Sequence, residues 1–233
     1  MSLLFYCSFS RNPKWPFPKN RLRLIEVSYF PKILMSSWTD RFNSLTGKRR
    51  IVVVRIFITL IGAESTTLLG VLNRAAQDAI ESDGDLAIMG ESLVEICESL
   101  LQRETNWSSV HNEGDVFWSE EEASDYLNEL FTDCTRRYLS ETDQSSDAPH
   151  QSFTLPMTPN VVVMLTLALE GEAPDLETDL SNIEALRRGL TQICTLQAQR
   201  RLRAIQVNFS PDQMGYVLTD DHLMQQFPEL IPL

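Results

Sequence analysis

The chain has 233 residues, of which 43% are hydrophobic, and its formal net charge is -12. This size and composition suffice for one good core, or for one core with a smaller helical lobe, and they argue against disorder throughout. The charge is split, because the residues up to Leu60 carry +9 and the remaining 173 carry -21. We expect the acidic part to repel nucleic acid and the basic part to favour an anionic surface such as a membrane.

Residues 1–34 differ in composition from the rest of the chain. They contain six Lys or Arg, one acid and four prolines, without a sustained helical or strand period. The apolar start lacks the basic lead and the small-residue cleavage pattern of a signal peptide. We therefore expect a poorly ordered or misassigned extension, with the natural start at Met35.

The segment "GKRRIVVVRIFITLIGAES", 47–65, looks at first like a membrane anchor. Its apolar part would be only about 20 Å long as a helix, against a hydrocarbon core of about 30 Å, and it contains Arg55. Eight of the eleven residues in 51–61 are Ile, Val or Thr, which favours a core strand. The basic lead-in of Lys48, Arg49 and Arg50 either touches an anionic membrane surface or balances an acidic neighbour.

Three helices are expected next. Apolar residues at spacings of three and four predict a helix over 65–82, which "SDGD" ends, and Asp85 is expected to cap a second helix that reaches Leu100. A capping box of Ser119 and Glu122 opens the third. The residues between the second and third helices, with Trp107 and "HNEGD", are expected to form a loop.

The carboxyl-terminal part has a different pattern. The polar stretch 141–159 is expected to be a linker, and the apolar run 161–169 to be a strand covered on both faces. A second capping box, Ser181 with Glu184, predicts a helix, and the alternating stretch 202–209 predicts a further strand. This order implies a parallel pair with a right-handed crossover. Thr219 is expected to cap a last short helix.

These elements predict an α/β (mixed α+β) fold. We expect a small sheet of at least three strands that includes a βαβ unit, together with a lobe of about three helices. The last two strands should be neighbours. Residues 35–140 and 160–233 are expected to pack together as one domain.

The residues give little sign of catalysis. Four cysteines and three histidines are scattered without the spacing of a metal site, and there is no phosphate-binding loop or nucleophile motif. We interpret Cys97, Cys134 and Cys194 as small core residues in a reducing compartment. The acidic run 120–122 is interpreted as the solvated first turn of a helix. No catalytic, cofactor-binding or metal-binding residue is predicted.

One cluster of residues is a candidate interaction or ligand site. Aromatic side chains surround charged ones in the expected loop 107–118, which is either a loop pinned by aromatics or a recognition loop. Glu170 ends the apolar strand that follows the linker. The candidate residues are Trp107, His111, Glu113, Asp115, Trp118 and Glu170.

Three stretches carry a resemblance to a known family: "NVVVMLTLALEGEAPDLETDLSNIEALRRGL", "RLRAIQVNFSPD" and "LTDDHLMQQFPELIPL". They resemble an uncharacterised family of cyanobacteria and chloroplasts, catalogued as domain of unknown function 1517. The similarity extends back to about Met35 and fits a shorter, cyanobacterial-type branch. The family has no established catalytic residues. The resemblance implies a photosynthetic host and, for relatives, association with plastid membranes.

We therefore expect a non-enzymatic interaction or regulatory protein that works beside photosynthetic membranes or their complexes. Its acidic helical surface would bind a protein partner, and its basic start would touch an anionic membrane. We expect no cofactor and no nucleic acid, and a cytoplasmic location, free or peripheral to the thylakoid membrane, rather than secretion. The alternative is a small-molecule-binding protein or enzyme whose site lies where the strand ends meet the loop around His111, with Glu170 and His111 as the residues to mutate.

Overall fold

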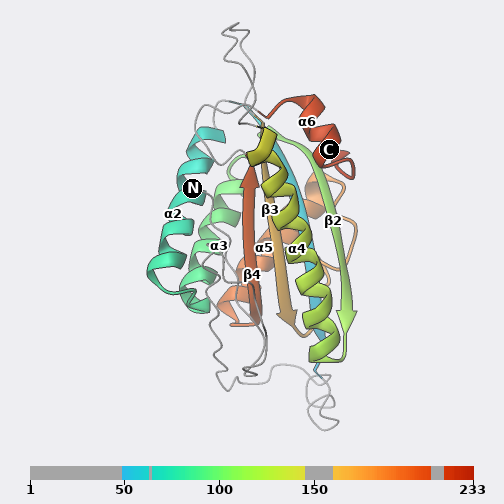
Figure 1. Cartoon of the computed structure of the whole chain (residues 1–233). Helices are drawn as coiled ribbons and strands as arrows, with labels where there is room; N and C mark the ends of the chain where they lie inside the picture. Colours follow the sequence, from blue (N-terminus) through green and yellow to red (C-terminus); the bar gives the residue numbers. More distant parts are fainter. Residues whose placement is uncertain (1–48, 63–64, 145–159, 211–217) are drawn as a thin grey trace, which may run out of the picture.

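The computed structural model describes residues 49–62, 65–144, 160–210 and 218–233. They form a mixed α+β domain around a five-stranded sheet in the order β4-β3-β1-β2-β5, in which every pair is antiparallel (Figure 1). The expected fold class is confirmed. The strands are β1 (Ile51–Ile61), β2 (Trp107–Phe117), β3 (Asn160–Glu170), β4 (Leu202–Ser210) and β5 (Ile231–Pro232). The helices are α2 (Ser65–Glu81), α3 (Leu86–Leu101), α4 (Glu120–Gln144), α5 (Ile183–Ala198) and α6 (Asp220–Gln226), with a 3-10 turn at Glu104–Asn106.

Several expectations concern residues that the structure does not describe. The extension 1–34, Lys48 and most of the expected linker lie outside the described ranges. Of the linker 141–159, the first four residues belong to the end of α4.

The expected core strand is confirmed as β1, the centre of the sheet. It pairs with β2 on one side and β3 on the other, and all its residues except Ile61 are buried. Its β-branched residues suit this position, because each face of a pleated central strand packs against a covering layer. None of the described helices has the length and hydropathy needed to cross a membrane.

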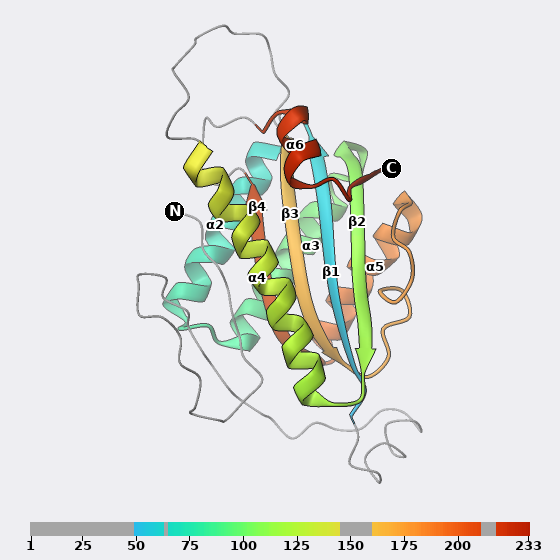
Figure 2. The same cartoon turned by 45° about the vertical axis from the view of Figure 1, so that its right-hand side comes forward.

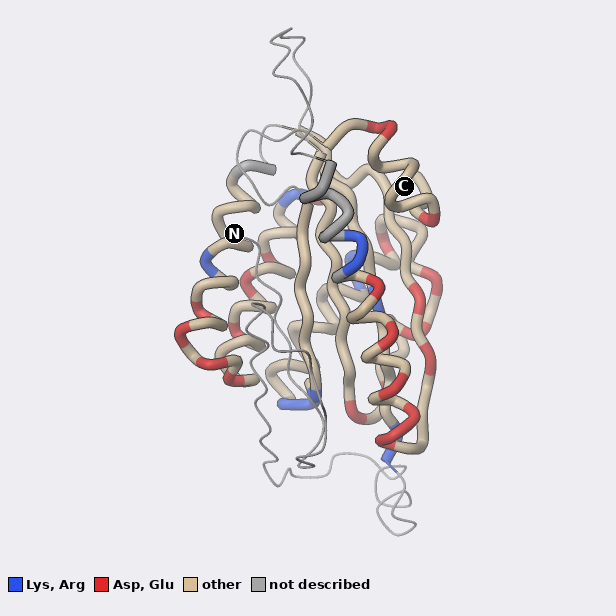
Figure 3. Tube along the Cα trace, viewed as in Figure 1, with Lys and Arg blue, Asp and Glu red and all other residues tan. Residues whose placement is uncertain are grey.

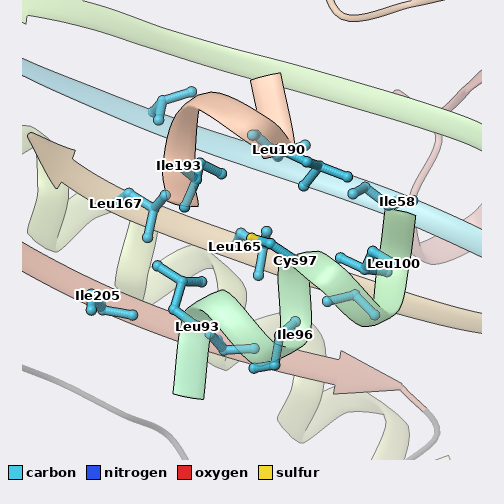
Figure 4. Packing of buried hydrophobic residues seen from close by; sticks show 14 of the residues in the cluster. Ile58, Leu93, Ile96, Cys97, Leu100, Leu165, Leu167, Leu190, Ile193 and Ile205 are labelled. Atoms are coloured by element: carbon cyan, nitrogen blue, oxygen red, sulfur yellow. The ribbon is translucent and has the colours of Figure 1, made fainter. Parts of the chain in front are cut away.

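The helices cover both faces of the sheet. Figure 2 shows α4 and α6 in front of the sheet, with α2, α3 and α5 behind it. The larger core lies under α2, α3 and α5, where even-numbered β1 residues such as Ile58 pack (Figure 4). Odd-numbered residues of β1 face α4 and α6 and join two smaller clusters. The three helices expected as one lobe are thus divided, because α4 has its own apolar stripe facing the opposite side of the sheet.

The expected parallel βαβ pair is wrong, although β3 and β4 are neighbours as expected. They pair antiparallel, with Val162 opposite Ser210. The reason is the route of residues 171–182. This segment leaves the end of β3, where the Gly171 amide donates to the Arg50 carbonyl, and ascends beside β2, where the Leu180 amide donates to Asn112 Oδ1. Helix α5 then returns to the starting end, so that β4 begins beside the end of β3.

The expected loop 107–118 is also wrong, because residues 107–117 form the strand β2. A bulge explains why the pattern hides it. Thr59 pairs with Ser109 and Leu60 with Trp107, so the extra residue places both Trp107 and Val110 against the larger core. Two buried residues three positions apart break the alternation that identifies a strand.

The helix starts agree with the sequence at most positions. Asp85 accepts from the Ala87 and Ile88 amides, and Thr219 accepts from the His222 amide. The second expected capping box differs, since Asn182 caps α5 by accepting from the Ala185 amide. Ser181 instead donates its hydroxyl to Asp179.

Candidate interaction surface at the β2–α4 junction

A polar row crosses the α4-facing side of the sheet. Register places Glu113 of β2 opposite Arg55 of β1, Arg55 opposite Thr166 of β3, and Thr166 opposite Gln206 of β4. Arg55, Thr166 and Gln206 are buried. Cys134 of α4 lies over the row, with its Sγ 3.8 Å from Thr166 Oγ1. The row therefore divides the apolar packing under α4 into two parts.

Arg55 is the centre of an ion-pair network. Its Nε donates to Glu113 Oε1 over 2.7 Å, and its Nη1 donates to Asp133 Oδ2 over 2.6 Å. Burial by itself raises the pKa of Asp133, but hydrogen bonds and charges from Arg55 and Arg137 outweigh it and lower that pKa. Asp133 is therefore ionised at neutral pH and holds α4 against the sheet.

The network continues to the carboxyl terminus of the chain. Arg137 Nε donates to Asp133 over 2.9 Å, and its Nη1 donates to the Gln226 carbonyl over 2.7 Å. Arg137 also pairs with Glu229 and lies over the rings of Phe57 and Phe227. These contacts fix α4, α6 and the final residues relative to one another, which indicates a structural role for the network.

Two of the candidate residues, His111 and Glu113, belong to this network. His111 packs against the ring of Phe57, with ring centroids 6.0 Å apart, and its Nε2 lies 3.9 Å from Glu113 Oε1. Trp107, in contrast, is buried in the larger core on the other face. The structure thus divides the predicted aromatic and charged cluster between the two faces of the sheet.

The remaining members of that cluster lie on the surface. Asp115 is exposed on β2, and Trp118, in the turn between β2 and α4, has 47% of its surface accessible. The first turns of α4 expose further carboxylates next to them, and the sequence has no Lys or Arg from Glu104 to Thr135. We define the acidic face as Asp115, Glu120, Glu121, Glu122, Asp125 and Glu129. Figure 3 shows the Asp and Glu residues of α4 and β2 in red.

The acidic face is held in place from below. Ala123, Leu127 and Phe131 of α4 are buried against Ile51 and Val53 of β1. The Phe117 and Tyr126 rings, 5.3 Å apart, join β2 to α4 beneath the acidic turns. Burial raises the pKa of Tyr126, so its phenol stays neutral. Because an apolar stripe faces the sheet, the carboxylates of α4 project outward from a fixed helix.

Glu170 lies far from His111. Glu170 pairs with Ile51, whereas His111 pairs with Phe57, so six strand positions, or about 20 Å, separate the two levels. Glu170 instead accepts from Arg203 Nε over 2.7 Å. The single pocket expected to contain both His111 and Glu170 is therefore wrong, because an antiparallel sheet does not bring its strand ends to one edge.

The basic lead-in to β1 has acidic partners within the chain. Arg50 Nη1 donates to Glu177 Oε1 over 2.9 Å and to the Gly171 carbonyl over 2.8 Å. Arg49 lies 4.0 Å from Glu170. The hydrogen bond from Arg50 lowers the pKa of Glu177. Of the two interpretations of the basic lead-in, the structure therefore supports pairing with an acidic neighbour in the case of Arg50.

A groove of about 470 Å³ lies between β2 and the ascending segment 171–182. Residues 112–116 line one wall and residues 176–179 the other. Asn112 bridges the two walls by donating to the Thr178 carbonyl over 3.0 Å and by accepting from the Leu180 amide. The groove therefore belongs to the same side of the molecule as Asp115, but it does not reach Glu170.

Fold and surface together define a mixed α+β domain with helices on both faces of an antiparallel sheet and an acidic, tryptophan-bearing surface at one junction. The chain belongs to the family described as "Protein of unknown function (DUF1517)", whose model matches residues 50–233. No curated protein and no solved structure matches the chain.

Proposed function

We propose that this is a non-enzymatic interaction protein that binds a Lys- or Arg-rich segment of a protein partner through its acidic face. The observation that carries the proposal is the exposed indole of Trp118, which lies beside the carboxylates of the acidic face. Tryptophan is enriched among the residues that dominate binding energies, and its ring attracts cations. The carboxylates would steer a basic segment towards it.

The proposed partner belongs to a photosynthetic membrane or one of its complexes. Support for this part comes from the family resemblance of the carboxyl-terminal stretches. The acidic face would repel anionic lipid headgroups and nucleic acid, so the proposal assigns it to a protein. Peripheral membrane contact through Lys48, Arg49 and Arg50 would have to compete with the hydrogen bond from Arg50 to Glu177.

The test is affinity purification with the full chain from a photosynthetic cell, followed by binding measurements with the partner that is captured. Trp118→Ala and the triple variant Glu121→Gln/Asp125→Asn/Glu129→Gln should each weaken binding at least tenfold. Affinity should also fall as salt rises, because screening weakens contacts between exposed charges. Both variants change exposed side chains and should leave the fold intact.

The matched control removes the same number of carboxylates from the other side of the sheet. Glu81, Glu95 and Glu98 are exposed on α2 and α3, and their conversion to Gln should leave binding unchanged. If the control variant lost as much binding affinity as the triple variant, net charge alone would explain the effect. The acidic face would then be rejected as the binding site. A partner that binds the Trp118→Ala variant as tightly as the parent chain would reject the proposal as well.

A further inference from the structure

Helices α3 and α5 cross closely on the larger core. A Cβ atom at Gly90 of α3 would lie 2.1 Å from the Gln197 side chain of α5, so this side chain packs directly against the α3 backbone at Gly90. Cys97 of α3 and Cys194 of α5 both pack in the larger core where these helices meet, and their thiols are close enough for each to shift the pKa of the other. Figure 4 shows Cys97 between α3 and the strands beneath it. Two thiols from distant parts of the sequence are therefore neighbours.

The two thiols have unequal environments. Cys97 is fully buried, whereas Cys194 is half-buried. Interaction with the Cys194 thiol, together with burial, raises the pKa of Cys97 well above its ordinary value. The same interaction lowers the pKa of Cys194. Cys194 is thus the better nucleophile of the pair, and Cys97 is the shielded one.

Cys194 opens onto a pocket of about 620 Å³. The pocket lies between the start of α3, the end of α5 and the start of β4. Apolar side chains such as Leu86 and Val94 line it, with Glu91 and Arg200 among its charged residues. This volume is within the range of pockets that hold small organic ligands, about 300–1,000 Å³. A small organic disulfide can therefore reach the Cys194 sulfur while Cys97 stays enclosed.

We propose that Cys194 and Cys97 form a thiol–disulfide exchange site for low-molecular-weight disulfides, with Cys194 as the attacking thiol and Cys97 as the resolving thiol. In the first step the Cys194 thiolate attacks a disulfide RS–SR, forming Cys194–S–SR and releasing RS⁻. In the second step Cys97, as its thiol loses its proton, attacks Cys194 Sγ and releases the second RS⁻. The small disulfide gains two electrons, the cysteine pair loses two, and the two thiol protons leave with the two RS⁻ groups as RSH.

The product disulfide would join α3 to α5 across the larger core. These helices lie on either side of β2, α4 and β3 in the sequence, so the cross-link closes a long loop. Closing a long loop restricts the unfolded chain and stabilises the folded one. The oxidised protein should therefore unfold at a higher temperature than the reduced protein.

The test treats the folded full chain, carrying Cys7→Ser, with oxidised glutathione, and maps the cysteines by alkylation and mass spectrometry. The parent should form a Cys97–Cys194 disulfide that dithiothreitol reverses. In the Cys97→Ser variant the reaction should stop at the mixed disulfide of Cys194 with one glutathione. In the Cys194→Ser variant Cys97 should stay unmodified. Cys134, which is buried between α4 and the sheet, serves as the internal control and should react at least tenfold more slowly than Cys194.

Several results would overturn the proposal. One is equal reactivity of Cys134 and Cys194, which would indicate reaction through unfolding. Another is a parent chain that retains both free thiols under conditions that modify an exposed thiol in a reference peptide. A stable glutathione adduct on Cys194 in the parent, without transfer to Cys97, would reject the resolving role. The parent measurement decides the question even where a variant fails to fold.

Discussion

Arg55 is the one charged residue in β1, and the structure gives its position a physical reason. It is buried at the middle of the central strand and contacts carboxylates from two other elements, Glu113 of β2 and Asp133 of α4. Its guanidinium also lies 4.8 Å from the centre of the Phe57 ring. A buried cation without partners is very costly, so these contacts fix both β2 and α4 relative to β1.

Replacement of Arg55 by alanine should lower the free energy of unfolding by about 3 kcal/mol, because it leaves Glu113 and Asp133 without their shared partner and opens a gap under α4. Urea unfolding followed by fluorescence measures this difference. Arg55→Met should cost less, since its side chain fills part of the gap without a charge. A larger loss for Arg55→Met than for Arg55→Ala would contradict this account.

Arg74 provides the control for the loss of an arginine. It is exposed on α2, and its Nη1 lies 3.9 Å from Glu95 Oε2. Exposed pairs of this kind contribute about 0–1 kcal/mol, so Arg74→Ala should change stability little. A loss equal to that of Arg55→Ala would show that burial of the network is not the cause.

At the scale of elements, β2 is where the sequence pattern and the structure differ most. The stretch "HNEGD" has the composition of a turn, and the bulge at Ser108 disrupts the alternation before it. Tertiary pairing with β1 nevertheless holds these residues extended, because β1 has one edge left after it pairs with β3. Gly114 is the position where this pairing needs a particular residue.

Gly114→Ala should destabilise the protein by about 1–3 kcal/mol. Its Cβ would lie 2.4 Å from the Val53 carbonyl oxygen and 3.1 Å from Val54 Cα, and these backbone atoms belong to the central strand. Chemical unfolding compared with the parent chain measures the effect. A Gly114→Ala variant as stable as the parent chain would show that the close contact with the β1 backbone does not require glycine at this position.

Gly70→Ala is the matched substitution without a clash. Gly70 is exposed on α2, and no atom lies within 4 Å of the Cβ that the variant adds. Alanine favours a helix interior over glycine by about 0.5–1 kcal/mol, so this variant should be more stable than the parent. Opposite signs for the two substitutions would identify the strand contact, rather than the added methyl group, as the cause.

At the scale of the whole molecule, stability should decrease from the centre of the sheet outward. β1 and β3 have hydrogen-bonded strands on both sides and covering helices on both faces. α6 has seven residues, none of them buried, and β5 has two exposed residues. Local opening therefore costs least at the carboxyl-terminal end of the chain.

Native-state hydrogen exchange measures this gradient. Amides in Val53–Ile58 and Val162–Ala168 should exchange slowest, and those of α6 and β5 should exchange orders of magnitude faster. Helix α3, which is packed in the larger core, is the helical comparison for α6 and should exchange more slowly than it does. Protection of α6 equal to that of β1 would contradict the proposed order of stability.

The sequence by itself determined the elements whose signals are local. The density of β-branched residues identified β1 and β3, the spacing of apolar residues identified α2, α3 and α4, and short polar side chains marked Asp85 and Thr219 as caps. It also indicated an acidic surface and the family. These features are local because each depends on a few neighbouring residues and on whether they suit a pleated or a helical backbone.

The tertiary structure alone decided the arrangement of these elements. The antiparallel direction of β4 depends on the path of residues 171–182, and the strand β2 depends on the free edge of β1. Contacts between distant residues separated His111 from Glu170, joined Arg55 to Asp133, and brought Cys97 beside Cys194. Sequence patterns report which face of an element is apolar, but several arrangements can bury the same faces, and only the packed chain selects one.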